Sequence, residues 1–413
     1  MKVLHVTPHL GGGVGKAHAA MRAVFPPEVE QTFALLEAPR DRRYADLIER
    51  GGARVIVAEN LEHVAKLAAD ADIVQFEFWN HPRMFECLAR CAFPPMRSVF
   101  WSHNSGIFRP LIPHGLMLEA MRFVFTTPAS LNIRSLVLLP EAMKRKIAVI
   151  NSGFGLPNVE IKEDRKRARP AIAYLGTVDF VKMHPGFFDA IDALPRNDIR
   201  VSVWGAVDRA GPVAARARAM RHPERIEFRG ETKDPVAALA DADIFFYPLQ
   251  PHHYGTAENA LVEAMSLGLV PIVLNNPAEQ AIVRNGETGL VAGSIEECAP
   301  LLQMLMLSPD VCERLSRNAV EHVAETRTPD QSASDFMILW LGLLGKPPLH
   351  CDLRGAVGDS PAEWFAASQS PVGMQGQSVH WDIAQQPSKG TLGHFESVFA
   401  GDESLARLRQ SVS

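Results

Sequence analysis

The chain has 413 residues, 47% hydrophobic and 22% charged, a composition typical of globular proteins rather than of disordered or low-complexity chains. The formal net charge of -5 excludes an overall basic field, so we expect no nucleic-acid partner. No apolar run reaches the roughly 20 residues that a membrane span needs, and the first residues lack the length and cleavage site of a signal peptide. The 5 scattered cysteines argue against a disulfide framework. These features predict a cytoplasmic protein of two or three domains.

Short β-branched or aromatic runs alternate with amphipathic stretches along the first part of the chain. Several of these runs are apolar on both faces, as in parallel strands that helices cover on both sides. The predicted strands are residues 2–7, 31–36, 54–58, 72–76, 98–102, 123–127 and 147–150, separated by helices such as 14–24, 45–50, 61–69 and 115–121. This rhythm predicts a doubly wound α/β domain over residues 1–160.

A charged segment, residues 162–169, predicts a linker, and the same rhythm restarts after it. The predicted strands of the second part are residues 171–176, 201–205, 226–229, 244–248, 270–274 and 290–292. The predicted helices are residues 235–240, 257–267, 279–284, 295–307 and 310–324. A second α/β domain is therefore expected over residues 170–330. Because ligands of open α/β sheets bind beyond the carboxyl ends of the strands, we expect the active site between the two domains.

The end of the chain differs in composition from the two predicted domains. An apolar stretch, residues 336–344, predicts a returning C-terminal helix over residues 331–345. Residues 346–413 are richer in Ser, Gln, Gly and Pro and have weak periodicity. We interpret them as a tail or small cap, and partial disorder is the alternative.

The segment 8–17 leads from a strand through a glycine-rich turn into a helix. Glycines let the backbone approach a ligand, and a helix N-terminus offers N–H groups to an anion, so Gly12 and Gly13 are candidate phosphate or sugar contacts. A tight turn without a ligand is the alternative. A Walker A loop is excluded because Ala17 follows Lys16, where Ser or Thr should hold Mg²⁺. A dinucleotide fingerprint is excluded because Lys16 stands where the third glycine belongs.

The segment 252–292 gives the strongest indication of a binding site. Glu263 interrupts the apolar side of the predicted helix 257–267, so its carboxylate is expected to face a half-buried cleft where sugar hydroxyls could donate to it. Glu258 has a simpler explanation, because a carboxylate near a helix N-terminus is favoured by the helix dipole. His252 and His253 either line this loop or form a solvated pair.

These residues resemble the donor-binding core of retaining GT-B glycosyltransferases of family 4 (glycosyl transferases group 1). The matching patterns are E-A-M-x-x-G-x-x-P at residues 263–271 and N-N-P-A-E-Q-A-I-V-x-N-G-x-T-G-L-V at residues 275–291. The two-domain rhythm extends the similarity over residues 1–344. The resemblance implies two Rossmann-like α/β domains facing across a cleft, with a C-terminal extension. It also implies a hexosyltransferase that moves a sugar from a nucleotide-diphosphate sugar to a carbohydrate or lipid-linked glycan acceptor, with retention.

The resemblance assigns roles to the predicted helix 257–267. Glu263 would accept hydrogen bonds from the hydroxyls of the donor ribose. The backbone amides of Asn259, Ala260 and Leu261 would face the diphosphate, in agreement with the general preference of anions for helix N-termini.

One position departs from the family pattern, because the family's first Glu falls on Gly255. Its contact to the transferred sugar would then come from Glu258, or from Tyr254 or Thr256 in the same loop. Of these three, we favour Glu258.

Further positions follow from the resemblance. Lys182 stands where the family has a lysine that neutralises the donor phosphates, whereas Thr177 replaces the usual arginine. His103, at the end of a predicted strand, matches a histidine that contacts the donor sugar or its phosphate. Gly230 and Glu231 match the turn that lines the nucleobase pocket.

The resemblance implies no metal ion and no other cofactor. Cys87 and Cys91 share a helix face, but no second pair with zinc spacing accompanies them. Two alternatives stay open: a catalytically silent nucleotide-sugar-binding or scaffold subunit, and a GT-B epimerase or phosphorylase. The resemblance further suggests polysaccharide biosynthesis in the cytoplasm, with peripheral association with the inner face of the membrane as an additional option.

Overall fold

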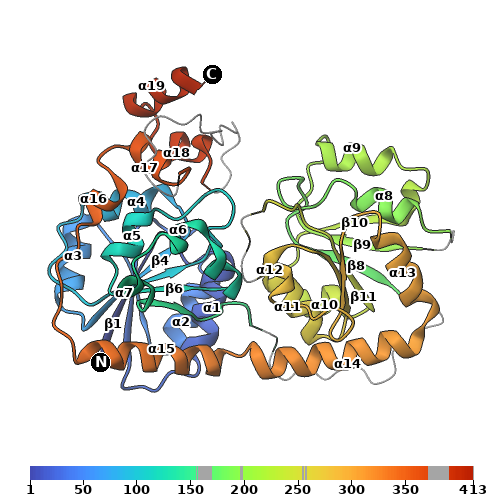
Figure 1. Ribbon diagram of the computed structural model, residues 1–413, viewed down its shortest axis with the longest axis horizontal. Helices are drawn as coiled ribbons and strands as arrows, with labels where there is room; N and C mark the ends of the chain where they lie inside the picture. The colour runs from blue at the N-terminus through green and yellow to red at the C-terminus, as the bar shows by residue number, and fades with distance from the viewer. Residues whose placement is uncertain are drawn as a thin grey trace. The chain divides into compact units, whose positions relative to one another are not determined.

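The computed structural model describes residues 1–154, 156, 170–195, 199–253, 255, 258–370 and 390–412. The chain forms two compact units (Figure 1), the first mainly Met1–Ser152 with Pro329–Ser413 and the second Gly153–His253 with Glu258–Thr328. The predicted linker, residues 162–169, lies outside the described residues. Within the described ranges, none of the helices is both long and apolar enough to cross a membrane.

The first unit is built on a parallel sheet of seven strands in the order β3-β2-β1-β4-β5-β6-β7. The strands are β1 (Lys2–Thr7), β2 (Glu30–Leu35), β3 (Arg54–Val57), β4 (Ile73–Phe78), β5 (Ser98–Ser102), β6 (Arg122–Phe125) and β7 (Ile147–Val149). Strands β1 and β4 pair in the middle of the sheet, where the strand order reverses. In doubly wound sheets, this reversal opens a ligand-binding crevice beyond the carboxyl ends of the strands.

The helices of the first unit lie on both faces of this sheet. They are α1 (Gly12–Arg22), α2 (Arg43–Arg50), α3 (Leu61–Ala69), α4 (Pro82–Arg90), α5 (His114–Glu119), η1 (Pro128–Asn132), α6 (Arg134–Val137), α7 (Glu141–Lys144) and α15 (Pro329–Leu344). The close approach of α1 to the preceding turn requires Gly15, because a Cβ there would lie 2.0 Å from the carbonyl oxygen of Leu10. Helix α15 returns to this unit and buries Phe336 and Trp340 in it.

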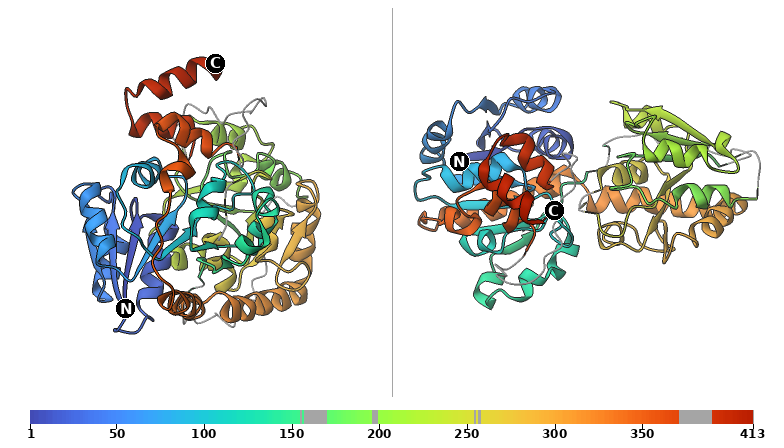
Figure 2. Two further views of the ribbon diagram at one scale, coloured as in Figure 1. Left: turned by 60° about the vertical axis from the view of Figure 1, so that its left-hand side comes forward. Right: turned by 90° about the horizontal axis from the view of Figure 1, so that it is seen from above.

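Four further helices follow α15 and form what we call the C-terminal cap, residues 346–370 and 390–412. They are α16 (Leu353–Val357), α17 (Pro361–Ala367), α18 (Leu392–Val398) and α19 (Glu403–Val412). Helices α16, α17 and α18 contact α4 of the first unit (Figure 2). The cap is held by apolar burial, since Trp364, Phe365 and Phe395 belong to the core of the first unit. Residues 371–389 and 413 lie outside the described residues.

The second unit has a parallel sheet of six strands in the order β10-β9-β8-β11-β12-β13. The strands are β8 (Ile172–Leu175), β9 (Val201–Trp204), β10 (Ile226–Gly230), β11 (Ile244–Tyr247), β12 (Val270–Leu274) and β13 (Leu290–Ala292). The helices are α8 (Phe187–Asp192), α9 (Pro212–Arg218), η2 (Pro223–Arg225), α10 (Pro235–Leu239), α11 (Asn259–Ser266), α12 (Pro277–Gln280), α13 (Cys298–Leu307) and α14 (Pro309–Thr326). Every predicted strand of both units is present, with its ends shifted by two residues at most. The predicted fold class, two doubly wound α/β sheets, is confirmed.

Candidate functional site

Two residues predicted to be catalytic, Lys182 and Glu258, form an ion pair in the second unit. Nζ of Lys182, in the loop after β8, lies 2.9 Å from Oε2 of Glu258, just before α11. The hydroxyl of Tyr247 donates to the same carboxylate oxygen over 2.9 Å. The side chain of Glu258 is 1% exposed and that of Lys182 is 17% exposed. Burial alone would raise the pKa of Glu258, but the charges of Lys182 and His253 and the hydrogen bonds from Lys182 and Tyr247 hold it below its ordinary value.

The backbone of Glu258 adopts an unusual conformation. Its φ of 40° and ψ of 59° are left-handed, a region that non-glycine residues seldom adopt. The residue stands at the N-cap of α11, yet its side chain makes no capping hydrogen bond. The carboxylate contacts Lys182 and Tyr247 instead, and these two contacts stabilise the strained backbone of Glu258.

A second carboxylate, Glu279 at the start of α12, extends this group. Oε1 of Glu279 lies 2.8 Å from Nε2 of His253, whose Nδ1 lies 3.9 Å from Oε1 of Glu258. Burial raises the pKa of Glu279, and the contact with His253 only partly opposes this rise. His253 is thus buried between two carboxylates, whereas its neighbour His252 is exposed. Glu279 is not among the site residues predicted from the sequence, although it lies within the segment 275–291 that resembles the family pattern.

The atoms of His253, Glu258 and Glu279 are close enough together to suggest a metal site. The ammonium of Lys182, however, already lies 2.9 Å from Glu258. A second cation at this carboxylate would be repelled by the first. The group therefore fits a lysine-neutralised carboxylate better than a metal centre.

The first turn of α11 presents backbone amides and buried oxygens. The amide of Leu261 donates to the carbonyl of Glu258 over 2.9 Å. The amides of Asn259 and Ala260 come before this first bond of the helix, so the helix itself offers them no acceptor. Oδ1 of Asn259 is buried and has no hydrogen-bond partner among the described residues. Glu263, one turn further, is buried on the same face of the helix. The buried oxygen of Asn259 needs a donor, which a hydroxyl group of a ligand would supply.

Three more predicted donor contacts lie elsewhere in the second unit. Thr177 is exposed, and its carbonyl accepts a hydrogen bond from the hydroxyl of Tyr174 over 2.7 Å. Gly230 ends β10 with a φ of 77° and, together with Glu231 and Phe228, lines a hollow of about 760 Å³. Thr256, like Tyr254, lies outside the described residues.

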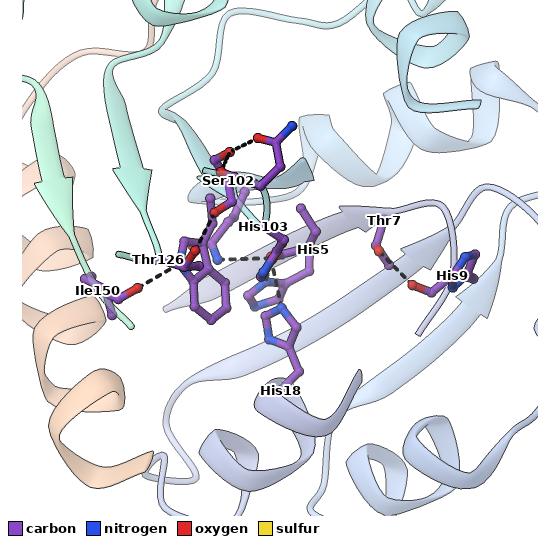
Figure 3. A network of polar contacts seen from close by, with 12 residues as sticks. His5, Thr7, His9, His18, Ser102, His103, Thr126 and Ile150 are labelled. Carbon is purple, nitrogen blue, oxygen red and sulfur yellow. Dashed lines mark hydrogen bonds and ion pairs between the residues drawn. The ribbon is translucent and has the colours of Figure 1, made fainter. Parts of the chain in front are cut away.

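In the first unit, His103 follows the carboxyl end of β5 and takes part in a buried polar network. Its Nε2 lies 2.8 Å from Oε2 of Glu77, on β4. The other oxygen of Glu77 lies 3.0 Å from Nδ1 of His5 and 3.0 Å from Nε2 of His18. Figure 3 shows the rings of His5, His18 and His103 turned toward one another, from β1, α1 and the end of β5. Glu77 is not among the site residues predicted from the sequence. The pattern that could have indicated it is the presence of two polar residues, Gln75 and Glu77, at alternating positions of an otherwise apolar strand.

Gly12 and Gly13 form the exposed N-terminus of α1, beyond the carboxyl end of β1. Gly12 has a φ of 60°, which explains the need for glycine there. These glycines and His103 belong to the first unit, whereas Lys182, Glu258 and the α11 residues belong to the second. The predicted site residues thus fall into two groups, one in each unit.

Comparisons with known proteins agree with this architecture. Residues 169–306 match the model of a family described as glycosyl transferases group 1. A glycosyltransferase from Rickettsia africae ESF-5 is similar in structure, with a TM-score of 0.65 and 14% sequence identity over 83% of this chain and 98% of that chain. Anabaena HepE in complex with UDP has a TM-score of 0.64 and 14% identity over 83% of this chain and 100% of that chain. Sucrose-phosphate synthase from Thermosynechococcus elongatus has a TM-score of 0.60 and 14% identity over 84% of this chain and 100% of that chain.

Identities this low establish the fold, which is GT-B, and no more. No curated protein matches the chain in sequence.

Proposed function

We propose that this protein is a glycosyltransferase that moves a sugar from a nucleotide-diphosphate sugar to a carbohydrate or lipid-linked glycan acceptor. The observation that carries the proposal is the Lys182–Glu258 pair beside the first turn of α11, inside the segment that matches the glycosyl transferases group 1 model. HepE, one of the similar structures, holds UDP, which supports a UDP-sugar as the first donor to test.

The chemistry needs a place where negative charge can develop on the departing diphosphate. A fixed ammonium and the amides at a helix N-terminus stabilise such charge without rearranging during the reaction. Glu258 holds the ammonium of Lys182 at a partly exposed position, where a phosphate oxygen can reach it. The amides of Asn259 and Ala260 lie at the start of the same helix.

Two polar side chains in the first two turns of α11 suit the hydroxyl groups of the donor. Oδ1 of Asn259 and the carboxylate of Glu263 are both acceptors, and a ribose or a hexose offers several hydroxyl donors. We further propose that the anomeric configuration is retained, with the leaving phosphate taking the acceptor's proton, and that no resident metal or cofactor takes part. NMR of the product anomer in the presence of a chelator tests both points.

Activity assays with a panel of nucleotide-diphosphate sugars test the proposal. Glu263→Gln and Lys182→Met should each lower kcat/KM at least about tenfold, because each removes a group that contacts the donor. Glu313→Gln and Lys66→Met are matched controls at exposed positions and should leave kcat/KM unchanged. If both site variants keep the activity of the parent, the site assignment is wrong.

A catalytically silent nucleotide-sugar-binding subunit is the second candidate. Two departures from the family pattern favour it: Thr177 in place of the arginine and Gly255 in place of the first Glu. Calorimetric binding of a nucleotide sugar without turnover on any acceptor would identify this case. A phosphorylase would instead show the absorbance of bound pyridoxal phosphate, and an epimerase would change the donor sugar without any acceptor.

The cellular setting follows from the proposed acceptor. We propose a role in polysaccharide or glycolipid synthesis in the cytoplasm, with the protein peripheral to the inner face of the membrane when the acceptor is lipid-linked. Sedimentation with vesicles that carry the acceptor lipid, compared with vesicles that lack it, tests this setting.

A further inference from the structure

The connection between β6 and β7, which contains η1, α6 and α7, has an inner face that packs on the first unit. Ile133, Leu136 and Leu139 are buried and belong to the core of that unit. These three side chains already anchor the connection to the sheet. Apolar residues on its outer face are therefore not required by the packing of the connection and need another explanation.

The outer face carries three large apolar side chains within eight residues. Val137 is 70% exposed, Leu138 is 54% exposed and Leu131 is 47% exposed. A single exposed apolar side chain is ordinary on a protein surface, whereas a group of them is typical of a surface that binds a partner. With Arg134, which is exposed in the same stretch, these residues form what we call the outer patch.

The connection is also basic, although the whole chain has a net charge of -5. Its basic residues are Arg134, Lys144, Arg145 and Lys146, and its one acidic residue is Glu141. Glu141 is paired with Lys144, with 2.6 Å between its Oε1 and Nζ of the lysine. Arg134 and Arg145 are exposed, and no carboxylate among the described residues forms an ion pair with either guanidinium. These two charges are therefore available to an anionic partner.

Exposed apolar side chains together with unpaired basic ones fit the surface of an anionic bilayer. The apolar side chains enter the boundary between headgroups and acyl chains, and the basic side chains meet lipid phosphates. A second copy of this chain fits less well. In a twofold interface each patch faces its own copy, which would bring like charges together.

The outer patch follows the carboxyl end of β6. Helix η1 begins at Pro128, shortly after β6 ends at Phe125. The hydroxyl of Ser130 donates to the carbonyl of Ser105 over 2.8 Å, which joins the connection to the loop after β5. Ligands of doubly wound sheets bind beyond the carboxyl ends of the strands. A bilayer at the outer patch would therefore lie near the ligand-binding edge of this sheet, which suits a lipid-linked acceptor.

We propose that the outer patch docks the first unit on a membrane surface that contains anionic lipids, with Val137 and Leu138 in the interfacial layer and Arg134 at lipid phosphates. This proposal rests on the glycosyltransferase function and the membrane setting proposed above, and adds the surface and the lipid charge that the contact requires. The contact needs no glycan acceptor, so a bilayer without one should bind the chain.

Co-sedimentation of the full chain with lipid vesicles tests the proposal. The parent should bind vesicles of phosphatidylcholine and phosphatidylglycerol at least about tenfold more tightly than vesicles of phosphatidylcholine alone, and high salt should weaken this binding. Val137→Ser/Leu138→Ser should lower the partition constant about tenfold. Ile338→Ser/Leu341→Ser, at exposed positions of α15, is the matched control and should bind like the parent.

A second pair of variants tests the charge. Arg134→Gln/Arg145→Gln should weaken binding to the phosphatidylglycerol vesicles at least about fivefold. The matched control is Arg50→Gln/Arg54→Gln, at exposed positions near β3, the opposite edge strand of the sheet, and it should bind like the parent. If the parent does not distinguish the two kinds of vesicle, or if both variants of the connection bind like the parent, the proposal is wrong. Loss of a dimer in these variants without any change in vesicle binding would show an interface between copies instead.

Hydrogen exchange locates the contact without any substitution. Peptides that cover residues 131–146 should exchange more slowly when phosphatidylglycerol vesicles are present, and unchanged exchange would contradict the proposal. The vesicles carry neither a donor nor an acceptor, so these results do not depend on transfer activity. Absence of transfer from every donor would instead contradict the proposed function.

Discussion

Nζ of Lys182 lies 2.9 Å from Oε2 of Glu258, a carboxylate that is almost completely buried. The contact connects the loop after β8 with the start of α11, two elements that are distant in the chain. Because a buried carboxylate is costly without a cation, each partner depends on the other. The same contact fixes an ammonium beside a helix N-terminus, which is the arrangement that a diphosphate group requires.

Removal of the lysine should therefore destabilise the second unit. In Lys182→Met the carboxylate of Glu258 stays buried without its cation, and we expect a loss of about 3 kcal/mol in the free energy of unfolding. The double variant Lys182→Met/Glu258→Gln should recover most of this loss, because the uncompensated charge is gone. Hydrogen exchange of the peptides that contain β8 and α11 measures both effects. Equal stabilities of the single and double variants would contradict this account of the pair.

The stability of the first unit should depend on pH through His5. The pKa of His5 is about 4 in the folded protein because of burial, against 6.5 for an ordinary histidine. As the pH falls below 6.5, the unfolded chain binds a proton that the folded chain does not bind, so stability falls toward pH 4. The loss is about 1.4 kcal/mol per pH unit, or roughly 2 kcal/mol between pH 6.5 and 5.

His5→Gln should flatten this dependence, because glutamine does not titrate. Unfolding can be followed by tryptophan fluorescence, since Trp79, Trp101, Trp340 and Trp364 lie in the first unit. Burial also lowers the pKa of His114, so the parent and the variant have to be compared by the difference between their slopes. Identical slopes would show that His5 is not the group responsible.

The fold could be predicted well where the local pattern determines it. Strand β12 is an uninterrupted apolar run and strand β5 has an apolar centre between two serines, and both were predicted with their observed bounds. Helix α9 has few large apolar residues and was missed, because its place is set by packing on the sheet and not by periodicity. The cap was predicted only as a tail or small cap for a similar reason: its isolated aromatic residues, such as Trp364, gain their partners only in the folded unit.

The candidate site divides in the same way. Glu263 could be proposed from the local pattern, and Lys182 and Glu258 from the resemblance of their segments to the glycosyltransferase family, although the roles of all three stay predictions. The partnership of Lys182 with Glu258 could not be proposed, because it joins two separate elements. Glu77 and Glu279 could not be predicted for the same reason. Their histidine partners, His103 and His253, lie on other elements of the fold.

Two glycine substitutions should have opposite effects on the first unit. Gly15→Ala places a Cβ 2.0 Å from the carbonyl oxygen of Leu10 and 2.9 Å from Cβ of Tyr44, and we expect a loss of about 2 kcal/mol in stability. Gly342→Ala in α15 meets no atom within 4 Å and should stabilise the unit by about 0.5 to 1 kcal/mol. Urea unfolding of both variants measures the difference. A stabilising Gly15→Ala would contradict the close packing of α1.

The C-terminal cap should contribute to the stability of the first unit. Trp364 is fully buried, and its indole donates to the carbonyl of Gly358 over 2.8 Å. Trp364→Ala should cost about 3 to 5 kcal/mol, whereas Trp364→Phe keeps most of the apolar volume and should cost less. Thermal unfolding followed by circular dichroism compares the two variants. Parent-like stability of Trp364→Ala would show that the cap is not part of this core.

The central claim is that the second unit binds the diphosphate of a nucleotide sugar through Lys182 and the start of α11. Isothermal titration calorimetry with UDP and with uridine, on the parent and on Lys182→Met, tests it most directly. The parent should bind UDP at least about tenfold more tightly than uridine, and this ratio should fall toward one in the variant. Equal affinities of the parent for UDP and uridine, or an unchanged ratio in Lys182→Met, would contradict the claim.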